Sequence, residues 1–374
     1  MIINYLKNGT LLPVFDDDPN DIKVVHNALK VLDSGKKISE EGVIDVQDCG
    51  AAYRFLMPLL TVTKGKWLLT GTERLLQRPI MPLVSFLKAK GACIEKTEKG
   101  WQVEGRNLQI DNFEIDTSET SQFASAVMMV FGSKVQEFND SYGLTVLRSY
   151  GLQNPYIKMT QTLLQTSNLS SFLHFADWSA AVFWMANALL TPNAHYILKD
   201  LHFDGLQGDA AIVSWFEKWG LVFTEKENGI EVKHIKNIEI PEQKIDVAQM
   251  PDLAMILAVL SVCYPFQLTL SGLKNLNLKE SNRLDIMVKE LSQLTKVKKI
   301  SKDTIILYKR TKTLPETFHF DSYNDHRFVM AWSLFKNFGI VVIQNEECVK
   351  KSYPLFIKNN FALITQKIYF CPKF

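Results

Sequence analysis

A segment in the C-terminal half, KESNRLDIM (residues 279–287), combines charges of both signs where a helix is expected to begin. Glu280 and Arg283 are three residues apart, so both project to one side of that helix. A carboxylate held near Lys279 and Arg283 can lie beside a bound anion and still accept or donate a proton. An ordinary capped helix with surface ion pairs would show the same pattern.

A second charged segment, SYNDHRFVM (residues 322–330), stands directly before an apolar helix expected over 328–335. A helix N-terminus attracts an anion through its free N–H groups and its dipole. The planar guanidinium of Arg327 suits phosphate or carboxylate. The alternative is an Asp-capped helix with a solvated arginine. His326 fits a structural hydrogen bond better than the role of a catalytic base.

Three segments of the N-terminal half place polar groups where helices begin. In CGAAYRFL, Gly50 would let the backbone approach a ligand closely, and Arg54 on an apolar helix is costly unless it is paired or binds an anion. In LQRPIMPLV, Arg78 precedes a proline that opens a helix. For both arginines an ordinary salt bridge is an equal alternative. The third segment, ETSQFASAV, supplies either a capping set or a phosphate-binding patch, namely Thr120, Ser121 and Gln122.

Two carboxylates and a lysine complete the set of candidates. In DVAQMPDLAM, Asp252 is expected to support the helix N-terminus, which leaves Asp246 available for chemistry, although a turn-stabilising role is the simpler alternative for Asp246. Lys351 in ECVKKSYP fits a plain surface lysine. Together, cations and carboxylates near loop-to-helix junctions suit an enzyme for a small, multiply anionic substrate. The sequence contains no P-loop lysine motif, no GxGxxG and no HExxH.

The elements that must position these residues recur along the chain. Residues 67–105, 196–232 and 268–307 each read as an apolar strand, a polar loop, an amphipathic helix and a final strand after a polar turn, and a fainter copy begins at Leu144. Stacked units of this kind collect active groups at one end. The loops between strand and helix carry polar side chains that suggest a shared ligand site: Arg78, Gln153, Gln207 and Arg283.

Apolar spacing predicts the individual elements. Amphipathic helices are expected over 82–89, 210–219 and 284–294. More uniformly apolar segments predict buried helices over 51–60, 122–131, 178–190 and 251–262. Short strands are expected over 66–69, 101–103, 144–147, 195–198, 229–232, 267–270 and 304–308. Because polar turns return the later strands to the sheet, the pattern indicates mixed sheets of βαββαβ units rather than a simple parallel array.

Bulk composition limits the class of protein. A chain of 374 residues is long enough for two domains, and the boundary is expected near residues 191–193, which gives domains of 1–193 and 194–374. The 42 basic and 40 acidic residues argue against a nucleic-acid partner, because the net charge is only +2. Five scattered cysteines without a CxxC pair indicate reduced thiols in the cytoplasm and no zinc site. Neither a secretory signal nor a membrane-spanning run is apparent, and a monomer is expected.

The order of the motifs resembles one known family. The segments CGAAYRFL, LLTGTERLLQRPI, TSQFASAV, NPYIKMT, LQGD, DVAQMPDLA, LKESNRL, YNDHR and ECVKKSYP follow one another as in the 5-enolpyruvylshikimate-3-phosphate synthases, from about Phe15 to Phe361. Two sister families fit less well. UDP-N-acetylglucosamine enolpyruvyl transferases carry a reactive cysteine where this chain has TERLLQRP, and RNA 3′-phosphate cyclases lack the KESNR and NDHR pair in this arrangement.

The resemblance implies an α/β fold of the enolpyruvyl transferase type, inside-out and barrel-like. It would have two domains, each of three βαββαβ units, with the substrate cleft between them and the first unit truncated. It further implies transfer of the enolpyruvyl group from phosphoenolpyruvate to the 5-hydroxyl of shikimate 3-phosphate, with release of phosphate. This is a reaction of the shikimate pathway of aromatic amino acid biosynthesis, and the family uses no metal or organic cofactor.

Motif position within the resemblance assigns a role to each candidate residue. Asp246 would take the proton of the 5-hydroxyl, and Glu280 would move the proton at the methylene carbon. Phosphoenolpyruvate would be held by Gly50, Arg78, Arg283, Arg327 and Lys351. Shikimate 3-phosphate would be held by Thr120, Ser121, Gln122, Tyr156, Asp246 and Lys279. The supporting residues would be Arg54 and His326.

The chain also departs from the family pattern. The Lys, Ser and Arg of an opening LPGSKSxSNR-like segment have no counterpart, and Ala51 and Asn282 replace a threonine and an aspartate. The serine before the Pro-Tyr pair is replaced within the dipeptide 153–154. Loss of one charged contact in a dry site costs about 10²–10³ in rate. Two hypotheses therefore stand: a transferase, or a catalytically impaired or inactive relative that keeps the fold and binds a phosphorylated anion.

Overall fold

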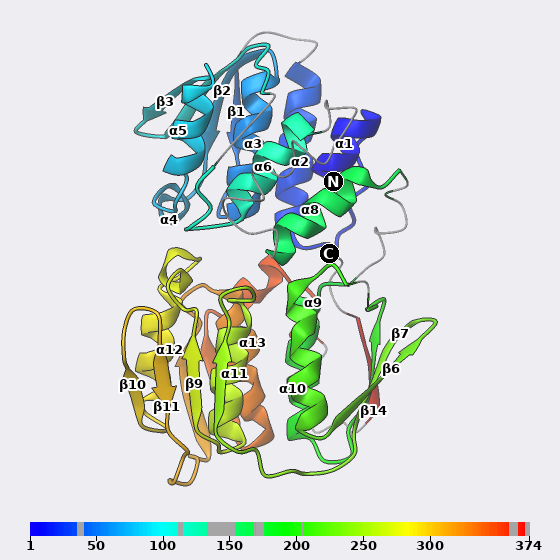
Figure 1. Cartoon of the computed structure of the whole chain (residues 1–374), viewed down its shortest axis with the longest axis vertical. Coiled ribbons are helices and arrows are strands. Elements are labelled where there is room, and N and C mark those ends of the chain that lie inside the picture. The colour runs from blue at the N-terminus through cyan, green and yellow to red at the C-terminus, as the bar shows by residue number, and fades with distance from the viewer. Residues whose placement is uncertain are drawn as a thin grey trace. The chain divides into compact units, whose positions relative to one another are not determined.

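The computed structural model describes residues 1–35, 41–110, 115–132, 154–167, 169, 176–203, 205–358 and 366–370. The chain forms two compact units (Figure 1). The first unit comprises residues 1–16 and 20–169, and the second comprises 17–19 and 170–374.

The first unit contains one sheet and a group of helices. Its strands are β1 Glu41–Asp45, β2 Gly65–Thr70, β3 Cys93–Thr97 and β4 Gly100–Gly105. Its helices are α1 Ile2–Asn8, α2 Asn20–Gly35, α3 Gly50–Val62, α4 Glu73–Leu76, α5 Met81–Ala89, α6 Gln122–Phe131 and α8 Pro155–Gln165. The strand order is β1-β2-β4-β3, with β1 parallel to β2 and with β4 antiparallel to both of its neighbours.

The second unit contains three sheets. Its strands are β5 His195–Lys199, β6 Leu221–Lys226, β7 Gly229–His234, β8 Gln243–Asp246, β9 Leu268–Ser271, β10 Val297–Lys299, β11 Ile305–Leu307, β12 Thr317–Asp321, β13 Ile340–Gln344 and β14 Gln366–Phe370. Its α-helices are α9 Trp178–Leu190, α10 Val213–Lys218, α11 Leu253–Cys263, α12 Arg283–Leu291 and α13 His326–Ser333. Its 3₁₀ helices are η3 Gly208–Ile212, η4 Leu276–Leu278, η5 Leu334–Asn337 and η6 Glu346–Lys351.

One topology recurs in the sheets of both units. The sheet β10-β11-β9-β8 repeats the first unit's sheet, with β8 parallel to β9 and an antiparallel hairpin beyond. In the sheet β14-β5-β7-β6, strand β14 from the far end of the chain takes the place of the first parallel strand. Strands β12 and β13 form a parallel pair around α13. A complete unit therefore reads βαβαββ along the chain, and the expected order βαββαβ was wrong, because the first strand of each unit went unrecognised.

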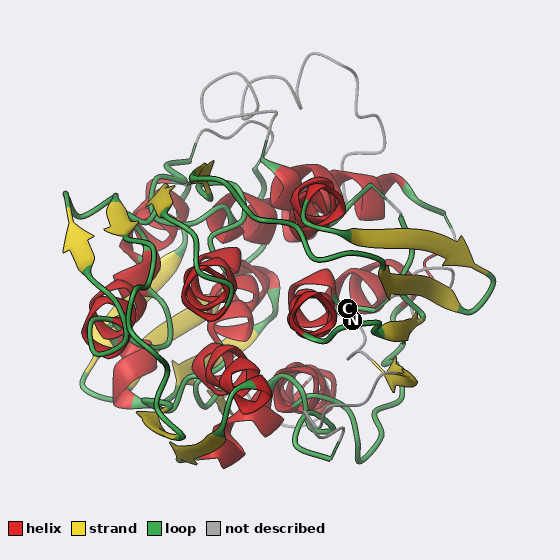
Figure 2. Cartoon of the chain, turned by 90° about the horizontal axis from the view of Figure 1, so that it is seen from below, coloured by secondary structure: helices red, strands yellow, loops and turns green. Residues whose placement is uncertain are grey.

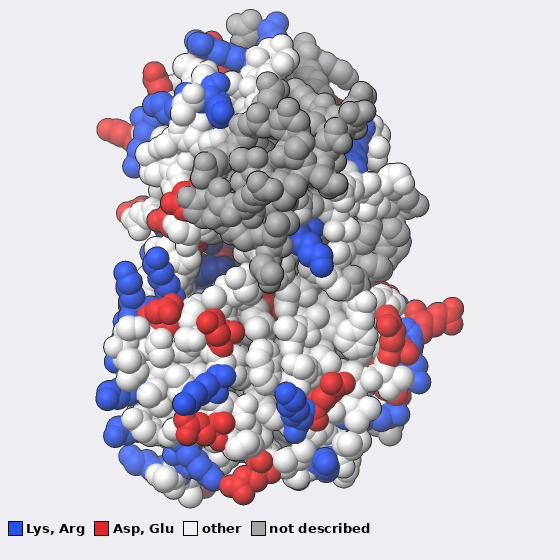
Figure 3. All heavy atoms as spheres, in the orientation of Figure 1, with Lys and Arg blue, Asp and Glu red and all other residues white. Residues whose placement is uncertain are grey.

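Burial explains the arrangement of the layers in the second unit. Every residue of α11 is buried, and so is every residue of α9 from Trp178 to Leu189 except Ser179. These helices are apolar on all sides, so they fill the interior while the sheets cover them. Figure 2 looks along the helices, which are seen end-on inside with strands outside them. On the face shown in Figure 3, cationic and anionic side chains are interspersed over this unit, as the small net charge leads one to expect.

The observed division of the chain differs from the expected boundary at residue 193. The first unit ends at Leu169, and the second takes up the chain from Ser170. Helix α9 accounts for the difference, since it packs against β5, β7 and α11 of the second unit. A pattern that is apolar on all sides predicts that a helix is buried, but it does not predict in which domain's core the helix lies.

Most predicted elements that fall within the described residues are confirmed. The helices expected over 122–131 and 178–190 match α6 and α9 residue for residue, and α3, α5, α11 and α12 lie where helices were expected. The helix expected over 210–219 is split between η3 and α10. The strand expected over 144–147 and the loop residue Gln153 lie outside the described residues.

The remaining structural findings concern thiols and membrane spans. The cysteines that the structure describes, Cys49, Cys93, Cys263 and Cys348, form no disulfide with one another. Among the described residues, no helix is both long and apolar enough to cross a membrane.

Candidate active site

Three central helices of the second unit each begin after an aspartate. Asp177 precedes α9 and accepts a hydrogen bond from the Ser179 backbone N–H at 2.9 Å. Asp325 precedes α13 and accepts one from the Arg327 N–H at 3.0 Å. Asp252 precedes α11 but makes no capping bond. Because a carboxylate suits a helix N-terminus, these aspartates can be held there as anions that attract cations.

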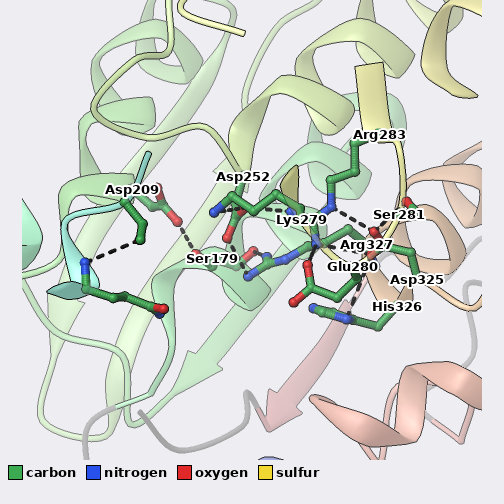
Figure 4. A network of polar contacts seen from close by, with 12 residues as sticks. Ser179, Asp209, Asp252, Lys279, Glu280, Ser281, Arg283, Asp325, His326 and Arg327 are labelled. Atoms are coloured by element: carbon green, nitrogen blue, oxygen red, sulfur yellow. Dashed lines mark hydrogen bonds and ion pairs between the residues drawn. The ribbon is translucent and has the colours of Figure 1, made fainter. Parts of the chain in front are cut away.

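Arg283 lies at the centre of the charged cluster (Figure 4). Arg283 is only 1% exposed, so its charge must be compensated inside the protein. Nε donates to Asp325 Oδ2 at 2.7 Å and Nη1 donates to Asp252 Oδ1 at 2.7 Å. Nη2 donates to Glu280 Oε2 at 2.8 Å and to Asp325 Oδ1 at 3.1 Å. Burial alone would lower the pKa of Arg283, but Asp325, Glu280 and Asp252 together raise it above its ordinary value.

Asp252 is shared among three cations. Besides Arg283, it accepts a hydrogen bond from Arg327 Nη2 at 3.4 Å and lies 3.7 Å from Lys279 Nζ. Burial opposes its charge, but Lys279, Arg327 and Arg283 hold the pKa of Asp252 below its usual range. Asp252 was expected to support the N-terminus of α11, and it does stand at the N-cap position, but its side chain makes no capping bond and turns to the guanidinium of Arg283 instead.

Glu280 and His326 border the same cluster. Glu280 is bound by Arg283, and its side chain stays 19% exposed, so a ligand could still reach it. Burial, with Arg327 nearby, lowers the pKa of His326 to about 4, which makes the imidazole neutral at pH 7. Its Nδ1 has no hydrogen-bond partner among the described residues and lies 3.9 Å from Asp325 Oδ1. The structure gives His326 no role as a proton carrier in this state.

Asp246 ends β8 and is exposed. Its Oδ1 accepts a hydrogen bond from the Ala248 N–H at 2.8 Å, and Gly272 (φ +79°) leaves room for it, since a Cβ there would lie 2.5 Å from Oδ1. The equivalent strands β1 and β12 end in Asp45 and Asp321, which make the same bond to the residue two positions on, at 2.7 Å each. The turn-stabilising role of Asp246 is therefore present, and it leaves the other carboxylate oxygen for chemistry.

A second cluster lies in the first unit, where α3 begins. A Cβ at Gly50 would lie 2.5 Å from Arg78 Nη1 and 2.7 Å from Cζ, so the guanidinium of Arg78 rests on the bare glycine backbone. Arg54 is 3% exposed and donates from Nη1 to Gln122 Oε1 at 2.8 Å and from Nε to the Pro79 carbonyl at 3.2 Å. Arg54 thus has neutral partners in these bonds, where a salt bridge was the alternative.

The helices α6 and α8 bring further polar groups to this unit. Gln122 begins α6, and its N–H donates to Thr120 Oγ1 at 3.2 Å, while Ser121 precedes the helix without a side-chain capping bond. Asn154 caps α8 by accepting from the Tyr156 N–H at 3.0 Å, and the Tyr156 ring stacks on Phe55. In contrast to α9, α11 and α13 of the second unit, the helices α3, α6 and α8 all follow uncharged residues: Cys49, Ser121 and Asn154.

The structure thus brings the sequence candidates together in two sets. One set lies in the second unit: Lys279, Glu280, Arg283, His326 and Arg327. The other lies in the first unit: Gly50, Arg54, Arg78 and Gln122. Lys351 ends η6, which packs against the helix of Arg327. Sequence reasoning expected Asp252 at a helix start and offered an aspartate cap in SYNDHRFVM, which Asp325 provides, but it missed that both carboxylates hold the cations.

A protein-family model decides the relationship. The model for EPSP synthase (3-phosphoshikimate 1-carboxyvinyltransferase) matches residues 17–359. The chain belongs to this family. The resemblance found in the motif order and the expected fold class are thereby confirmed.

Individual relatives agree with the family match. A 3-phosphoshikimate 1-carboxyvinyltransferase of Bacteroides fragilis is 30% identical over 382 aligned positions, which cover 95% of this chain and 89% of the relative. One from Pyrococcus abyssi is 28% identical, over 84% of this chain and 77% of the relative. Among solved structures, EPSP synthase from Acinetobacter baumannii aligns with a TM-score of 0.56 at 19% identity, over 85% of this chain and 78% of that one. This structural likeness supports the family fold.

Proposed function

We propose that the chain transfers the enolpyruvyl group of phosphoenolpyruvate to the 5-hydroxyl of shikimate 3-phosphate and releases phosphate. The observation that carries the proposal is the charged cluster of Lys279, Glu280, Arg283 and Arg327, partly open to solvent, in a chain whose family match spans residues 17–359. The relatives similar to this chain bear the name of this enzyme.

The second-unit cluster suits phosphoenolpyruvate. Its phosphate and carboxylate need several cations, and Arg283, Arg327 and Lys351 are the expected ligands there. Arg283 is fixed by three carboxylates at 2.7–3.1 Å, whereas Arg327 and Lys279 approach Asp252 only at 3.4 and 3.7 Å. The longer contacts are weaker. We therefore expect Arg327 and Lys279 to give up Asp252 for a bound anion while Arg283 stays as the fixed point.

The first-unit cluster suits anionic groups for a different reason. Helices α3 and α6 begin after uncharged residues, so no carboxylate at these positions offsets the positive end of the helix dipole. Two side chains place donors near those helix ends. Arg78 rests against Gly50, and Gln122 is held by Arg54. Arg78 and Gly50 would contribute to the phosphoenolpyruvate site. The groups for shikimate 3-phosphate would be Thr120, Ser121, Gln122 and Tyr156, with Lys279 and Asp246 from the second unit.

The chemistry needs two proton transfers. Asp246 would remove the proton from the 5-hydroxyl as the oxygen attacks C2 of phosphoenolpyruvate, and Glu280 would deliver a proton to C3, which gives a tetrahedral intermediate with a methyl group. Glu280 would then take a proton back from that methyl group as the C–O bond to phosphate breaks. Arg283 and Arg327 would stabilise the charge that accumulates on the departing phosphate.

The proposal places the reaction in the cytoplasm, which agrees with the absence of a disulfide among the described cysteines, and treats the chain as a monomer that needs no cofactor. The alternative, an inactive relative that only binds a phosphorylated anion, is not favoured, because the chain matches enzymes named as transferases over most of its length.

Purified chain mixed with both substrates should release inorganic phosphate, and omission of either substrate should abolish the release. Glu280→Gln keeps the shape and a hydrogen-bond acceptor for Arg283 but cannot move the proton, so it should lower kcat by about 10²–10⁴. Phosphate release from phosphoenolpyruvate alone, or none from folded chain with both substrates, would contradict the proposed transfer.

A further inference from the structure

The segment LQGD, residues 206–209, lies next to the start of α9 and has no role in the chemistry above. Its glutamine holds the entry to that helix at two points. Gln207 Oε1 accepts a hydrogen bond from the Trp178 N–H at 2.9 Å, and its Nε2 donates to the Ala176 carbonyl at 3.0 Å. Gln207 therefore fixes the backbone on both sides of Asp177, at the helix N-terminus.

Asp209 holds the next residue of the same turn. Its Oδ2 accepts a hydrogen bond from the Ser179 hydroxyl (Figure 4). The bond joins η3, which contains Asp209, to the first turn of α9, and these elements also pack together. Since Asp177 caps Ser179 through its backbone N–H, Ser179 is bound at both its N–H and its side chain.

The carbonyl of Ser179 points to the candidate substrate-binding arginine. Arg327 Nη1 donates to Ser179 O at 2.9 Å. The same guanidinium also approaches Asp252 through Nη2 at 3.4 Å, and its Nε has no hydrogen-bond partner among the described residues. The Ser179 carbonyl is thus the short contact that sets the direction of the Arg327 guanidinium.

The pKa of Asp209 shows that its carboxyl group and the guanidinium of Arg327 influence each other. Burial raises the pKa of Asp209 to about 6, with a further contribution from the charge of Asp252, while the Ser179 hydroxyl and Arg327 oppose the rise. The charge of Arg327 thus acts on Asp209 at a distance. The physical link between them is Ser179, which bonds to Asp209 through its hydroxyl and to Arg327 through its carbonyl.

We propose that Gln207 and Asp209 are positioning residues that orient Arg327 for phosphoenolpyruvate through the first turn of α9. The proposal rests on the proposed function, because it takes Arg327 as a ligand of that substrate. Residues that lock the turn restrict the guanidinium to one direction before the substrate arrives. Removal of such a supporting residue costs the site this preorganisation.

The test compares variants that remove or keep the Asp209–Ser179 bond. Asp209→Ala and Ser179→Ala should each raise the KM for phosphoenolpyruvate about tenfold and leave that for shikimate 3-phosphate within about twofold. Because both changes remove the same bond, the double variant should be no worse than either single one. Asp209→Asn keeps an acceptor for the hydroxyl and should stay close to the unmodified chain.

The matched control is Asp303→Ala, which likewise removes a carboxylate that accepts a hydrogen bond, here from the Lys274 N–H at 3.0 Å between β9 and η4. It should leave both KM values unchanged. An unchanged KM for phosphoenolpyruvate in Asp209→Ala, or an equal rise for both substrates, would overturn the proposal.

A direct measurement of phosphoenolpyruvate binding by calorimetry separates this proposal from the proposed function. If the unmodified chain binds phosphoenolpyruvate but releases no phosphate, the transfer reaction fails, and the dissociation constant of Asp209→Ala still decides the positioning role. A tenfold weaker constant would support it, and an unchanged one would overturn it. If the unmodified chain does not bind phosphoenolpyruvate, Arg327 is not its ligand and the positioning proposal falls as well.

Discussion

Arg283 and Asp325 form a two-point ion pair in which Nε meets Oδ2 at 2.7 Å and Nη2 meets Oδ1 at 3.1 Å. Both residues are buried, at 1% and 0% exposure. The pair joins the first residue of α12 to the residue that caps α13, and it thereby fixes the two helix ends that carry Arg283 and Arg327. A forked pair of this kind restrains direction as well as distance.

Arg283→Lys should show how much the two-point ion pair contributes to the free energy of unfolding. A lysine keeps the charge but cannot reach Asp325 at two points and still serve Asp252 and Glu280. Leaving buried carboxylates short of donors should cost about 2–4 kcal/mol in the free energy of unfolding, measured by urea titration. The exposed pair of Lys299 and Asp285, at 2.6 Å, offers a control: Lys299→Ala should cost less than about 1 kcal/mol. Equal losses for the two variants would contradict the account.

Gly50→Ala should act through Arg78. The new methyl group would lie 2.5 Å from Arg78 Nη1, and the flexible arginine side chain can move aside at little cost in stability. The displaced guanidinium should raise the KM for phosphoenolpyruvate about tenfold. In an Arg78→Ala background the same glycine change should have no further effect on KM. An additive effect in that background would show that the methyl group acts on something other than Arg78.

Gln122→Glu tests the anion-binding character of the first unit. The carboxylate would keep the 2.8 Å contact to Arg54 as an ion pair, so stability should not fall. It would also repel a phosphate at the start of α6, and the KM for shikimate 3-phosphate should rise at least about tenfold. Gln102→Glu, on the exposed side of β4, is the isosteric control and should change neither KM. A shikimate 3-phosphate KM unaffected by Gln122→Glu would remove Gln122 from the site.

His326 should make stability depend on pH. Its pKa is about 4 in the folded chain against an ordinary value of 6.5, so between these values the unfolded chain binds more protons, and stability falls as pH falls from 6.5 to 4. The loss should reach about 3 kcal/mol at most relative to a His326→Gln variant, at 1.36 kcal/mol per unit. The pKa of Asp209 is raised to about 6, which favours the folded chain as pH falls over nearly the same range, so only the difference between variant and unmodified chain isolates His326.

Urea titrations at several pH values measure this difference. The same substitution at His319, which is exposed on β12, controls for the loss of an imidazole. A gap between the unmodified chain and His326→Gln that does not change with pH would contradict a buried, neutral His326.

How far the sequence predicted the fold can be judged from particular elements. Helices α6 and α9 were predicted residue for residue, because long apolar runs bounded by capping residues leave little choice. Strands β1, β8 and β12 were missed: they are short, and segments such as QKID lack a clear alternation. Strand β14 pairs with β5 across most of the second unit's sequence, and no local pattern reveals such pairing.

The candidate site shows the same division between local and distant information. Arg54, Arg78, Arg283 and Arg327 were identified from their places at helix starts. The carboxylates that pair with them were not, since Asp252 in its own segment reads as a helix cap, and only the fold brings it to Arg283 at 2.7 Å. Partners far apart in sequence are fixed by packing, so a local reading finds the charges but not the pairs.

The most direct test of the proposed function is the reaction carried out in D₂O with both substrates and followed by proton NMR. A reaction that passes through a methyl group and returns a proton to Glu280 should form an enolpyruvyl ether of shikimate 3-phosphate whose vinyl positions have gained deuterium, with equal release of phosphate. Loss of phosphoenolpyruvate without this ether, or an ether whose vinyl protons are fully retained, would contradict the addition and elimination assigned to Glu280 and its cluster.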